Sequence, residues 1–291
     1  MRFIADFVAF SQYFNSGPAA SGNGLSGCAM GSEILTSAAN PLLKSVRRAI
    51  ARGRLTEDGY LVAEGFHLLE EAVRSGRPIQ AVLAGESVRE AVRSRLGGNP
   101  VRNITVRSAV LAGISSTETS QGVIALVRPP EWTLEQVLGG DTLAIVLDGV
   151  QEPGNAGAIV RSAEAFGATG IVFLKGAVNP FNPKCVRASA GSIFRLPCVY
   201  GIEEWKLLAA IRECGVDVLA AMPGDGVDIG SADFRRRAAL VIGSESRGIG
   251  ERLRQAAVRV RIPTSGVESL NAAVAAGILL YEARRQRARM P

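Results

Sequence analysis

The sequence predicts an α/β protein whose larger, C-terminal part is built around a parallel sheet. Short apolar runs alternate with helical segments along the second half of the chain, as expected where crossover helices join parallel strands. Aromatic residues make up only 5% of the chain, and 33 residues are glycine. The core must therefore consist mainly of Val, Leu, Ile and Ala, which suits buried parallel strands. A length of 291 residues exceeds one typical domain and indicates two.

A small α/β domain is predicted over residues 40–128. Asn40 and Pro41 stand where a helix cap and a first helical turn are expected, and a basic helix follows them. The further pattern predicts strands at 59–63, 79–84, 101–106 and 122–127, and helices at 64–75 and 87–96. Pro129 and Pro130 then break regular structure, so residues 129–141 are predicted to be a linker.

Residues 1–39 are predicted to be a disordered extension. Arg2, an apolar stretch and Cys28 superficially resemble a lipoprotein export signal. However, Asp6 interrupts the apolar stretch, and Ser, Gly and Asn replace it where such a signal would continue. Translation could also begin at Met30, and the sequence does not decide between the two starts.

Residues 142–291 show a second α/β series. Its strands are predicted at 143–147, 171–174, 216–221, 239–242 and 258–262. The chain closes with a long helix predicted over Ser269–Arg289, Ala-rich first and Arg-rich last. Positive charge at the C-terminal end of a helix complements the helix dipole.

The charge balance favours a polyanionic partner. Lys and Arg number 33 against 27 Asp and Glu, a formal net charge of +6. Any single run of arginines could be a solvated helix face. Four such runs favour phosphate contacts, because the planar guanidinium pairs bidentately with phosphate oxygens. The runs are Arg47, Arg48, Arg52 and Arg54; Arg89, Arg93 and Arg95; Arg235, Arg236 and Arg237; and Arg284, Arg285, Arg287 and Arg289.

Cysteine and histidine usage points away from a metal site. Cys28, Cys185, Cys198 and Cys214 form no CxxC pair, and His67 is the one histidine. The cysteines are predicted to be reduced thiols of a cytoplasmic protein. No apolar run approaches the ~20 residues needed to cross a bilayer. His67 lies on a predicted helix of the first domain, where a surface or packing role is commoner than catalysis.

Three glycine-bearing segments follow predicted strands of the second domain, where open α/β sheets bind ligands. The first, residues 147–161, is a strand, a turn and a helix predicted to be capped by Asn155, with Arg161 in its second turn. The second, residues 241–248, has glycines that allow close approach of backbone to a ligand. The third, residues 262–271, leads into the last helix. Ordinary turns and caps are the structural alternative for each, and none matches a P-loop or G-x-G-x-x-G.

In order and spacing, these three segments resemble the signature motifs of the SpoU (TrmH-like) family of RNA 2′-O-methyltransferases. Residues 182–197 look like a further segment of that family. The resemblance extends from Leu143 to the C-terminus. Less specifically, residues 40–127 resemble the family's N-terminal substrate-binding domain, with Glu64-Gly65 and residues 116–122 as the matching stretches.

The resemblance implies S-adenosylmethionine as cofactor, bound in a bent shape within a deep trefoil knot of the C-terminal domain. Carried over, the cofactor-binding residues would be Gly243, Glu245, Gly248, Ile262, Leu270 and Asn271. The catalytic residues would be Asn155, Arg161, Ser269 and Asn271. The implied reaction is in-line methyl transfer to a ribose 2′-hydroxyl of RNA, with no metal.

Arg161 matches a residue to which the family assigns the role of base. A guanidinium with a pKa above about 12 rarely gives up its proton. Clamping the neighbouring phosphate and stabilising developing negative charge is the more conservative role. Ser246 and Thr264 depart from the family pattern, which commonly has Gly and Met there. Serine at position 246 would be strained if that position required a positive φ.

The resemblance further implies a homodimer formed through the C-terminal domain, with the helix over Ser269–Arg289 as the candidate interface. The N-terminal domain would recruit RNA, and a separate domain of this kind favours ribosomal RNA over tRNA. One alternative is a catalytically retired RNA-binding or ribosome-assembly protein of the same fold. Another is an unrelated nucleotide-binding α/β enzyme, disfavoured because phosphate-loop motifs are missing from the sequence.

Overall fold

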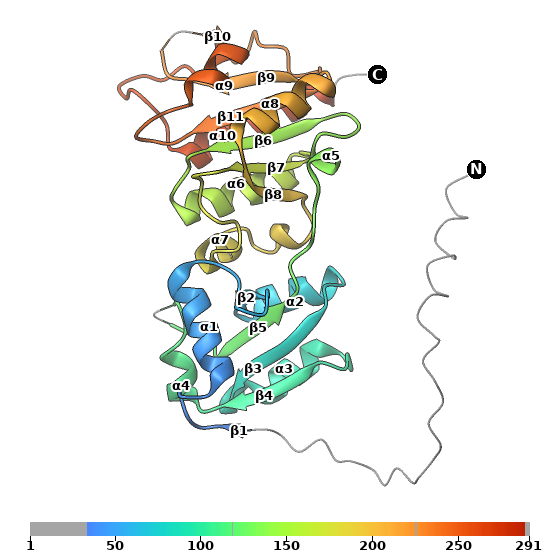
Figure 1. Cartoon of the computed structure of the whole chain (residues 1–291), viewed down its shortest axis with the longest axis vertical. Helices are drawn as coiled ribbons and strands as arrows, with labels where there is room; N and C mark the ends of the chain where they lie inside the picture. The colour runs from blue at the N-terminus through green and yellow to red at the C-terminus, as the bar shows by residue number, and fades with distance from the viewer. Residues whose placement is uncertain (1–33, 118, 225, 289–291) are drawn as a thin grey trace, which may run out of the picture. The chain divides into compact units, whose positions relative to one another are not determined.

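The computed structural model describes residues 34–117, 119–224 and 226–288 (Figure 1). The expectations for residues 1–33, with Cys28 and Met30, and for Arg289 lie outside this range. The prediction that residues 1–39 form a disordered extension is wrong for its last residues. Ile34–Leu35 form a short strand, β1, that pairs in parallel with Thr105 and Val106. These two apolar residues cover an otherwise open edge of the first sheet.

The first sheet has five strands in the order β1-β4-β3-β5-β2. Pairs β1–β4 and β3–β4 are parallel, while β3–β5 and β2–β5 are antiparallel. The predicted strand at 59–63 begins two residues later, because Gly59 closes a turn with φ +80°. The elements are α1 (Pro41–Arg52), β2 (Leu61–Glu64), α2 (Phe66–Arg74), β3 (Ile79–Gly85), the 3₁₀ turn η2 (Glu86–Val88), α3 (Arg89–Leu96), β4 (Arg102–Val106), α4 (Ser108–Ala112) and β5 (Val123–Val127).

Helix α1 begins as its sequence predicts. The Asn40 side chain accepts a hydrogen bond from the backbone N of Leu42 (2.9 Å), and Pro41 occupies the first turn. Gly53 ends the helix in the left-handed conformation. The buried residues Leu43, Val46 and Ala49 follow helical spacing and pack on the first sheet.

The predicted linker at 129–141 is folded against the second sheet. It contains α5 (Leu134–Val137), which starts with a capping box between Thr133 and Gln136. Val137 and Leu138 are fully buried in the core of the second domain. The Thr-x-x-Gln spacing was the sequence signal for this helix.

The second sheet has seven strands, all parallel, in the order β10-β12-β9-β11-β6-β7-β8. This confirms the parallel-sheet prediction. The edge strands β8 and β10 were not predicted, because they are half exposed and lack a continuous apolar run. The trefoil knot stays a prediction. The strands are β6 (Leu143–Asp148), β7 (Gly170–Leu174), β8 (Cys198–Ile202), β9 (Asp217–Ala221), β10 (Val227–Asp228), β11 (Ala238–Gly243) and β12 (Val258–Arg261).

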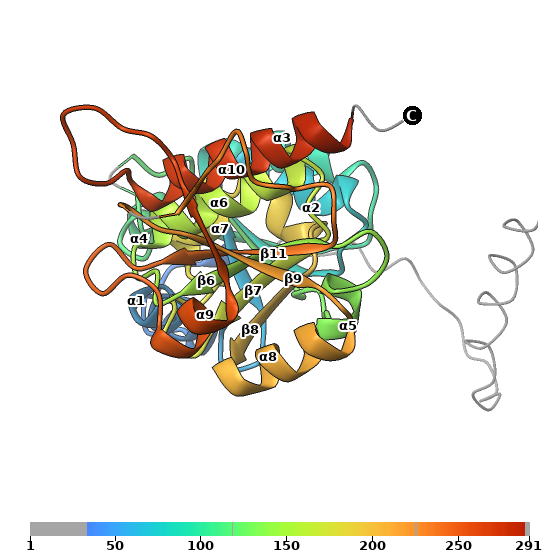
Figure 2. The same ribbon diagram turned by 90° about the horizontal axis from the view of Figure 1, so that it is seen from above.

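Helices cover both faces of this sheet (Figure 2). On β6, Ile145 and Leu147 belong to one core cluster and Ala144 and Val146 to the other, as alternation along a strand requires. Within the described chain, no helix combines the length and apolar character of a membrane span. One face carries α6 (Pro153–Ala165), α7 (Pro183–Ala188), the 3₁₀ turn η3 (Ser192–Phe194) and α10 (Ala272–Arg287); the other carries α5, α8 (Glu204–Glu213) and α9 (Glu251–Ala256).

Ion pairs join helix α2 to the segment that follows α7. Glu71, only 5% exposed, pairs with Arg195, and Arg195 also pairs with Glu164 of α6 (2.6 Å). These two carboxylates raise the pKa of Arg195, the hydrogen bond to Glu164 contributing most. Arg77 donates to the carbonyl oxygen of Phe194 (2.8 Å). The buried Glu71 carboxylate therefore has a charged partner in Arg195, as a charge removed from water requires.

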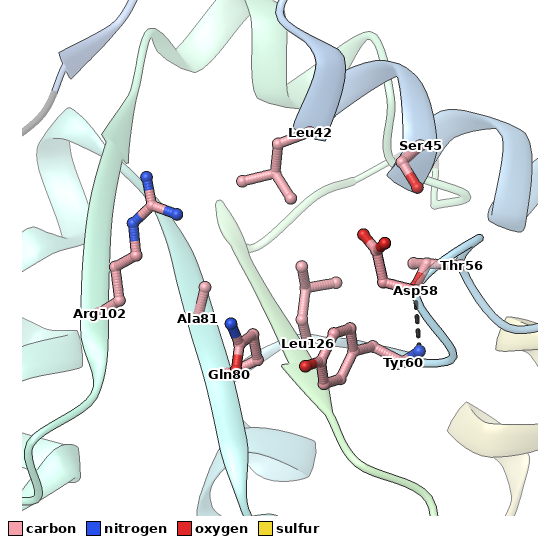
Figure 3. A pocket seen from close by; sticks show the side chains of 9 residues that line it. All are labelled: Leu42, Ser45, Thr56, Asp58, Tyr60, Gln80, Ala81, Arg102 and Leu126. Carbon is pink, nitrogen blue, oxygen red and sulfur yellow. Dashed lines mark hydrogen bonds between the residues drawn. The ribbon is translucent and has the colours of Figure 1, made fainter.

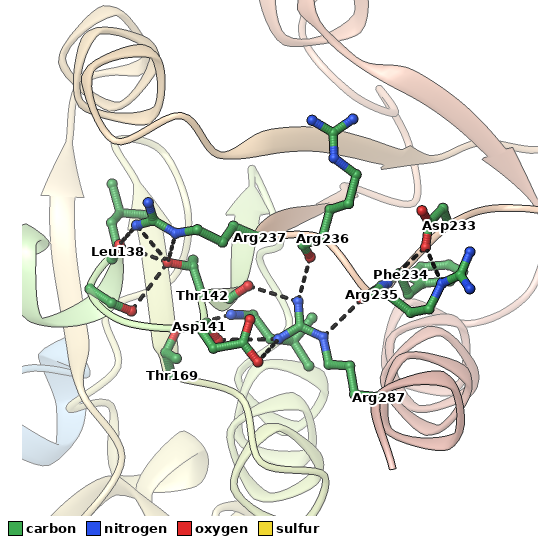
Figure 4. A network of polar contacts seen from close by, with 12 residues as sticks. Leu138, Asp141, Thr142, Thr169, Asp233, Phe234, Arg235, Arg236, Arg237 and Arg287 are labelled. Carbon is green, nitrogen blue, oxygen red and sulfur yellow. Dashed lines mark hydrogen bonds and ion pairs between the residues drawn. The ribbon is translucent and has the colours of Figure 1, made fainter. Parts of the chain in front are cut away.

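Several arginines of the predicted phosphate-binding runs instead hold the fold together (Figure 4). Arg287 donates to the carbonyl oxygens of Phe234 (2.8 Å), Arg236 (2.6 Å), Asp141 (3.1 Å) and Thr142 (2.9 Å). In the same region Arg237 donates to the carbonyl oxygens of Leu138 and Cys214. The phosphate-contact interpretation of these two arginines is therefore wrong.

Replacing Arg287 by alanine is expected to lower the free energy of unfolding by about 3 kcal/mol, because four carbonyl oxygens lose a charged donor. Burial lowers the pKa of Arg287, and Asp141 opposes that effect. The matched control is Arg284→Ala, an exposed arginine in the same helical turn. Urea unfolding followed by circular dichroism measures both. Equal midpoints for the two variants would contradict a structural role for Arg287.

Candidate functional site

The three glycine-bearing segments follow strands that end at one edge of the second sheet. Strands β6 and β11 are neighbours, with Asp148 paired to Gly243 at their carboxyl ends. Strand β12 ends at the same edge, separated from β11 by β9. Because all these strands are parallel, the loops that leave them gather at this edge.

Asn155 connects the three segments. Its side-chain Nδ2 donates to Oε1 of Glu245 (2.7 Å), which follows β11. Its Oδ1 accepts from Nδ2 of Asn271 (3.1 Å), which precedes α10. The three residues are distant in the sequence, and one amide group joins the other two.

Asn155 is not the helix cap that its sequence context predicted. Helix α6 begins at Pro153, and Glu152 caps it by accepting from the backbone N of Gly154 (3.3 Å). Asn155 is the third helical residue. Its amide is therefore not used for capping, which leaves both of its polar atoms to Glu245 and Asn271.

The loop after β11 is a tight hairpin. Ser244 and Gly248 exchange two backbone hydrogen bonds (3.1 and 2.9 Å), and Gly248 has φ +67°. A Cβ at Gly243 would lie 2.4 Å from the carbonyl carbon of Gly248, so only glycine fits there. The strain considered for Ser246 does not arise. Within the described ranges, Ala190 is the non-glycine residue with a positive φ.

Asp148 is a residue of the site that was not predicted from the sequence. Its Oδ2 accepts from the backbone N of Gly250 (2.6 Å) and so ties the chain just after the second segment to the start of the first. The Ser244 hydroxyl oxygen accepts from the backbone N of Arg247 (3.0 Å) and rigidifies the hairpin. The only sequence signal for Asp148 was its position as an acidic residue at the end of a buried strand.

The third segment ends in a helix cap, but at Asn271 rather than at Ser269. The Asn271 Oδ1 accepts from the backbone N of Ala273 (3.0 Å) and Val274 (3.3 Å), so α10 begins at Ala272. The Thr264 hydroxyl donates to the carbonyl oxygen of Val267 (2.9 Å) and closes the loop.

Other predicted residues of this segment have no hydrogen bond to Asn155 or Glu245. Ile262 and Leu270 are half-buried apolar side chains, and Ile262 packs against the core. Ser269 is exposed. They share a loop with Asn271, so the structure places them near the site by chain connectivity alone.

Arg161 is exposed on α6, in the third turn rather than the predicted second. Across residues 34–117, 119–224 and 226–288, no hydrogen bond or ion pair involves its guanidinium. It is on the same helix as Asn155. A guanidinium in this state is available to an anionic ligand at the carboxyl edge of the sheet.

Neither cysteine nor histidine chemistry is supported at this edge. Burial raises the pKa of the Cys185 thiol to about 12 and also raises that of Cys198, so neither forms a reactive thiolate near neutral pH. His67 lies on α2, with Nε2 3.3 Å from the carbonyl oxygen of Ala190. The described residues contain no group of three or more His, Cys, Asp and Glu placed to hold a metal ion.

Comparison with known proteins agrees with this arrangement. Residues 142–281 match the SpoU rRNA Methylase family, and residues 40–125 match the MRM3-like substrate binding domain. An uncharacterized tRNA/rRNA methyltransferase of Synechocystis, slr1673, is 33% identical over 87% of this chain and 93% of its own. The 23S rRNA (guanosine-2′-O-)-methyltransferase RlmB of Xylella fastidiosa is 33% identical over 76% of this chain and 90% of its own.

A solved structure of similar fold is the AdoMet-bound rRNA methyltransferase from Sinorhizobium meliloti. It has a TM-score of 0.77 and 29% identity, over 87% of this chain and 98% of that one. The three segments joined at Asn155 lie within residues 142–281, the range that matches the SpoU rRNA Methylase family. On the sequence and the fold together, the chain belongs to the SpoU rRNA methylase family.

Proposed function

We propose that this protein transfers the methyl group of S-adenosylmethionine to a ribose 2′-hydroxyl of RNA, and that the RNA is ribosomal. The observation that carries the proposal is the junction at Asn155, which ties Glu245 and Asn271 together at the carboxyl edge of the sheet. Relatives over most of the chain are named as 23S rRNA 2′-O-methyltransferases. The Sinorhizobium protein has the same fold and binds AdoMet.

The residues at the site suit S-adenosylmethionine. The cofactor carries a flat adenine with apolar faces, hydroxyls and an ammonium group, and when bound it supplies an already activated methyl. Ile262 and Leu270 offer half-buried apolar surface for the adenine. Glu245 offers an exposed carboxylate for cationic or hydroxyl groups. The backbone at Gly243 and Gly248 can approach a ligand closely because no side chain intervenes.

Asn271 would contribute both to binding the cofactor and to catalysis, since it caps α10 and contacts Asn155. Arg161 would hold the phosphate next to the reacting ribose and stabilise charge that develops on the 2′-oxygen. Ser269, exposed in the same loop, is the further polar group proposed to face the RNA.

A labelling experiment tests this function. The purified protein is incubated with methyl-labelled S-adenosylmethionine and unmodified 23S rRNA, with tRNA in parallel, and the RNA is digested to nucleosides. We expect label in a 2′-O-methylnucleoside from ribosomal RNA. Cofactor binding without label in any RNA, including ribosomal assembly intermediates, would favour the retired-enzyme alternative. Label from tRNA alone would overturn the substrate assignment.

We also propose a homodimer formed through α10, acting in the cytoplasm where ribosomal RNA is modified. Helix α10 presents the large apolar side chains Val274, Ile278 and Tyr281, which are 50%, 36% and 58% exposed. An apolar stripe of this kind on a helix is typical of a protein interface.

Light scattering after size exclusion is expected to give twice the mass of the chain. Replacing Ile278 by aspartate should give the monomer mass, because a charge in an apolar interface is costly. The control is Val227→Asp, at an exposed apolar residue on a different element. A monomer mass for the wild-type protein would contradict the dimer.

A further inference from the structure

A cavity of about 280 Å³ lies in the N-terminal domain between α1 and the first sheet (Figure 3). It is far along the chain from the segments joined at Asn155, and the proposed methyl transfer does not use it. Its wall is partly apolar and partly polar. The lining residues are Leu42, Ser45, Thr56, Asp58, Tyr60, Gln80, Ala81, Arg102 and Leu126.

The Ser45 hydroxyl is the first sign of a ligand site. Ser45 is only 8% exposed, and its Oγ has no hydrogen-bond partner among the described residues. Buried hydroxyls are normally paired, because desolvation without a partner destabilises the fold. The Ser45 side chain lines the cavity, so a bound group inside it could supply the missing partner.

The cavity has the chemistry of a slot for a flat, polar-edged molecule. The Tyr60 ring and the side chains of Leu42 and Leu126 supply apolar surface. Asp58 and Gln80 supply an exposed carboxylate and an exposed amide. Proteins bind unstacked RNA bases in this way, by stacking on an aromatic ring and by hydrogen bonds to the base edge.

A second cavity, of about 200 Å³, adjoins the first and shares Ser45 and Thr56 with it. Arginines line this second cavity. Arg48 is paired with Glu57, whereas Arg52 and Arg54 are exposed and no ion pair joins them to any described residue. Two such guanidiniums beside a base-sized slot suit the phosphate of a neighbouring nucleotide.

We propose that the cavity between α1 and the first sheet holds one unpaired nucleobase of the RNA, with the flanking phosphate at Arg52 and Arg54. The proposal rests on the proposed function, in which RNA is the substrate. It assigns a second contact with the RNA, at a nucleotide other than the one that is methylated. The Asp58 carboxylate only accepts hydrogen bonds, so it suits the exocyclic amino groups of adenine and cytosine, whereas uracil offers only its ring N3–H on that edge.

The test measures binding of fluorescein-labelled single-stranded nonaribonucleotides of A, C or U to the full chain by anisotropy. Tyr60→Leu removes the ring, and we expect it to weaken binding of the A and C oligomers about tenfold, the size of one lost stacking contact. Tyr60→Phe keeps the ring and should bind like the wild type. Asp58→Asn should reduce the preference for A and C over U. Because Asp58 is exposed, this substitution should leave the packing of the core unchanged.

Arg52→Ala and Arg47→Ala form a matched pair on α1. Both arginines are exposed, but only Arg52 lines the second cavity. We expect the larger loss of affinity, and the larger drop in salt dependence, for Arg52→Ala. Equal effects of the two would overturn the phosphate assignment.

Cofactor binding, measured by calorimetry, separates this inference from the proposed function. If the pocket variants bind S-adenosylmethionine and all oligomers as the wild type does, the nucleobase pocket is wrong while the methyltransferase stands. If the wild type binds no RNA at all, the proposed function fails with it. If the pocket variants lose affinity for free AMP but keep wild-type affinity for RNA, the cavity binds a free nucleotide. That result would overturn the RNA contact.

Discussion

Replacement of Arg161 by lysine is expected to lower turnover by about 100-fold, the usual cost of losing one donor to a developing oxyanion. Arg161 is exposed on α6, and its guanidinium forms no hydrogen bond or ion pair with the described residues. Its removal should therefore leave the fold unchanged. Lysine keeps the charge but loses the planar fork that binds two phosphate oxygens at once. Arg161→Ala should be at least as impaired.

Single-turnover methylation of ribosomal RNA under saturating cofactor is the measurement that isolates this effect. The matched control is Arg212→Lys, an exposed arginine on α8. Affinity for S-adenosylmethionine should be the same in both variants and the wild type. Near-normal turnover by Arg161→Lys would contradict both a phosphate clamp and a base at this position.

The sequence predicted the elements that carry a continuous apolar run. Strands β6, β7 and β11 are buried on both faces, and their runs lie within one residue of the predicted bounds. Strands β8 and β10 lie at the edges, where one side of each strand meets solvent and the apolar signal weakens. The same reasoning missed β1, because two residues carry no periodicity.

The sequence indicated which segments form the site but not how their side chains meet. Asn155 and Asn271 are 116 residues apart, and their hydrogen bond depends on how β6, β9, β11 and β12 are ordered in the sheet. The local sequence pattern also assigned the caps of two helices to the wrong residues. Asn155 seemed to be a cap, although Glu152 precedes the helix, and Ser269 seemed to start α10, although Asn271 caps it.

The roles of individual arginines in the basic runs could not be predicted from the sequence. Arg52 and Arg287 both lie in basic runs at helix ends, yet one is exposed and the other donates to four carbonyl oxygens. The difference depends on loops that approach α10 from distant parts of the chain. A charge count therefore supports a polyanionic partner only after the structural arginines have been set aside.

A second large effect is expected at the junction of the three segments. Asn155→Asp removes the amide donor and places a carboxylate against Oε1 of Glu245, which lies 2.7 Å from the present Nδ2. The lost hydrogen bond to a charged acceptor and the new repulsion should weaken S-adenosylmethionine binding by about tenfold or more. Calorimetric titration of the cofactor measures this loss, and circular dichroism checks that the fold is retained.

Glu245→Gln in the Asn155→Asp background tests whether the pair itself matters. The glutamine amide can donate to the new aspartate, so a donor and an acceptor again face each other with their roles reversed. We expect cofactor affinity in the double variant to lie within about threefold of that in Glu245→Gln alone, a coupling typical of contacting residues. Additive losses would mean that Asn155 does not act through Glu245. The hydrogen bond between Asn155 and Glu245 would then lie near the site without stabilising the hairpin that follows Gly243.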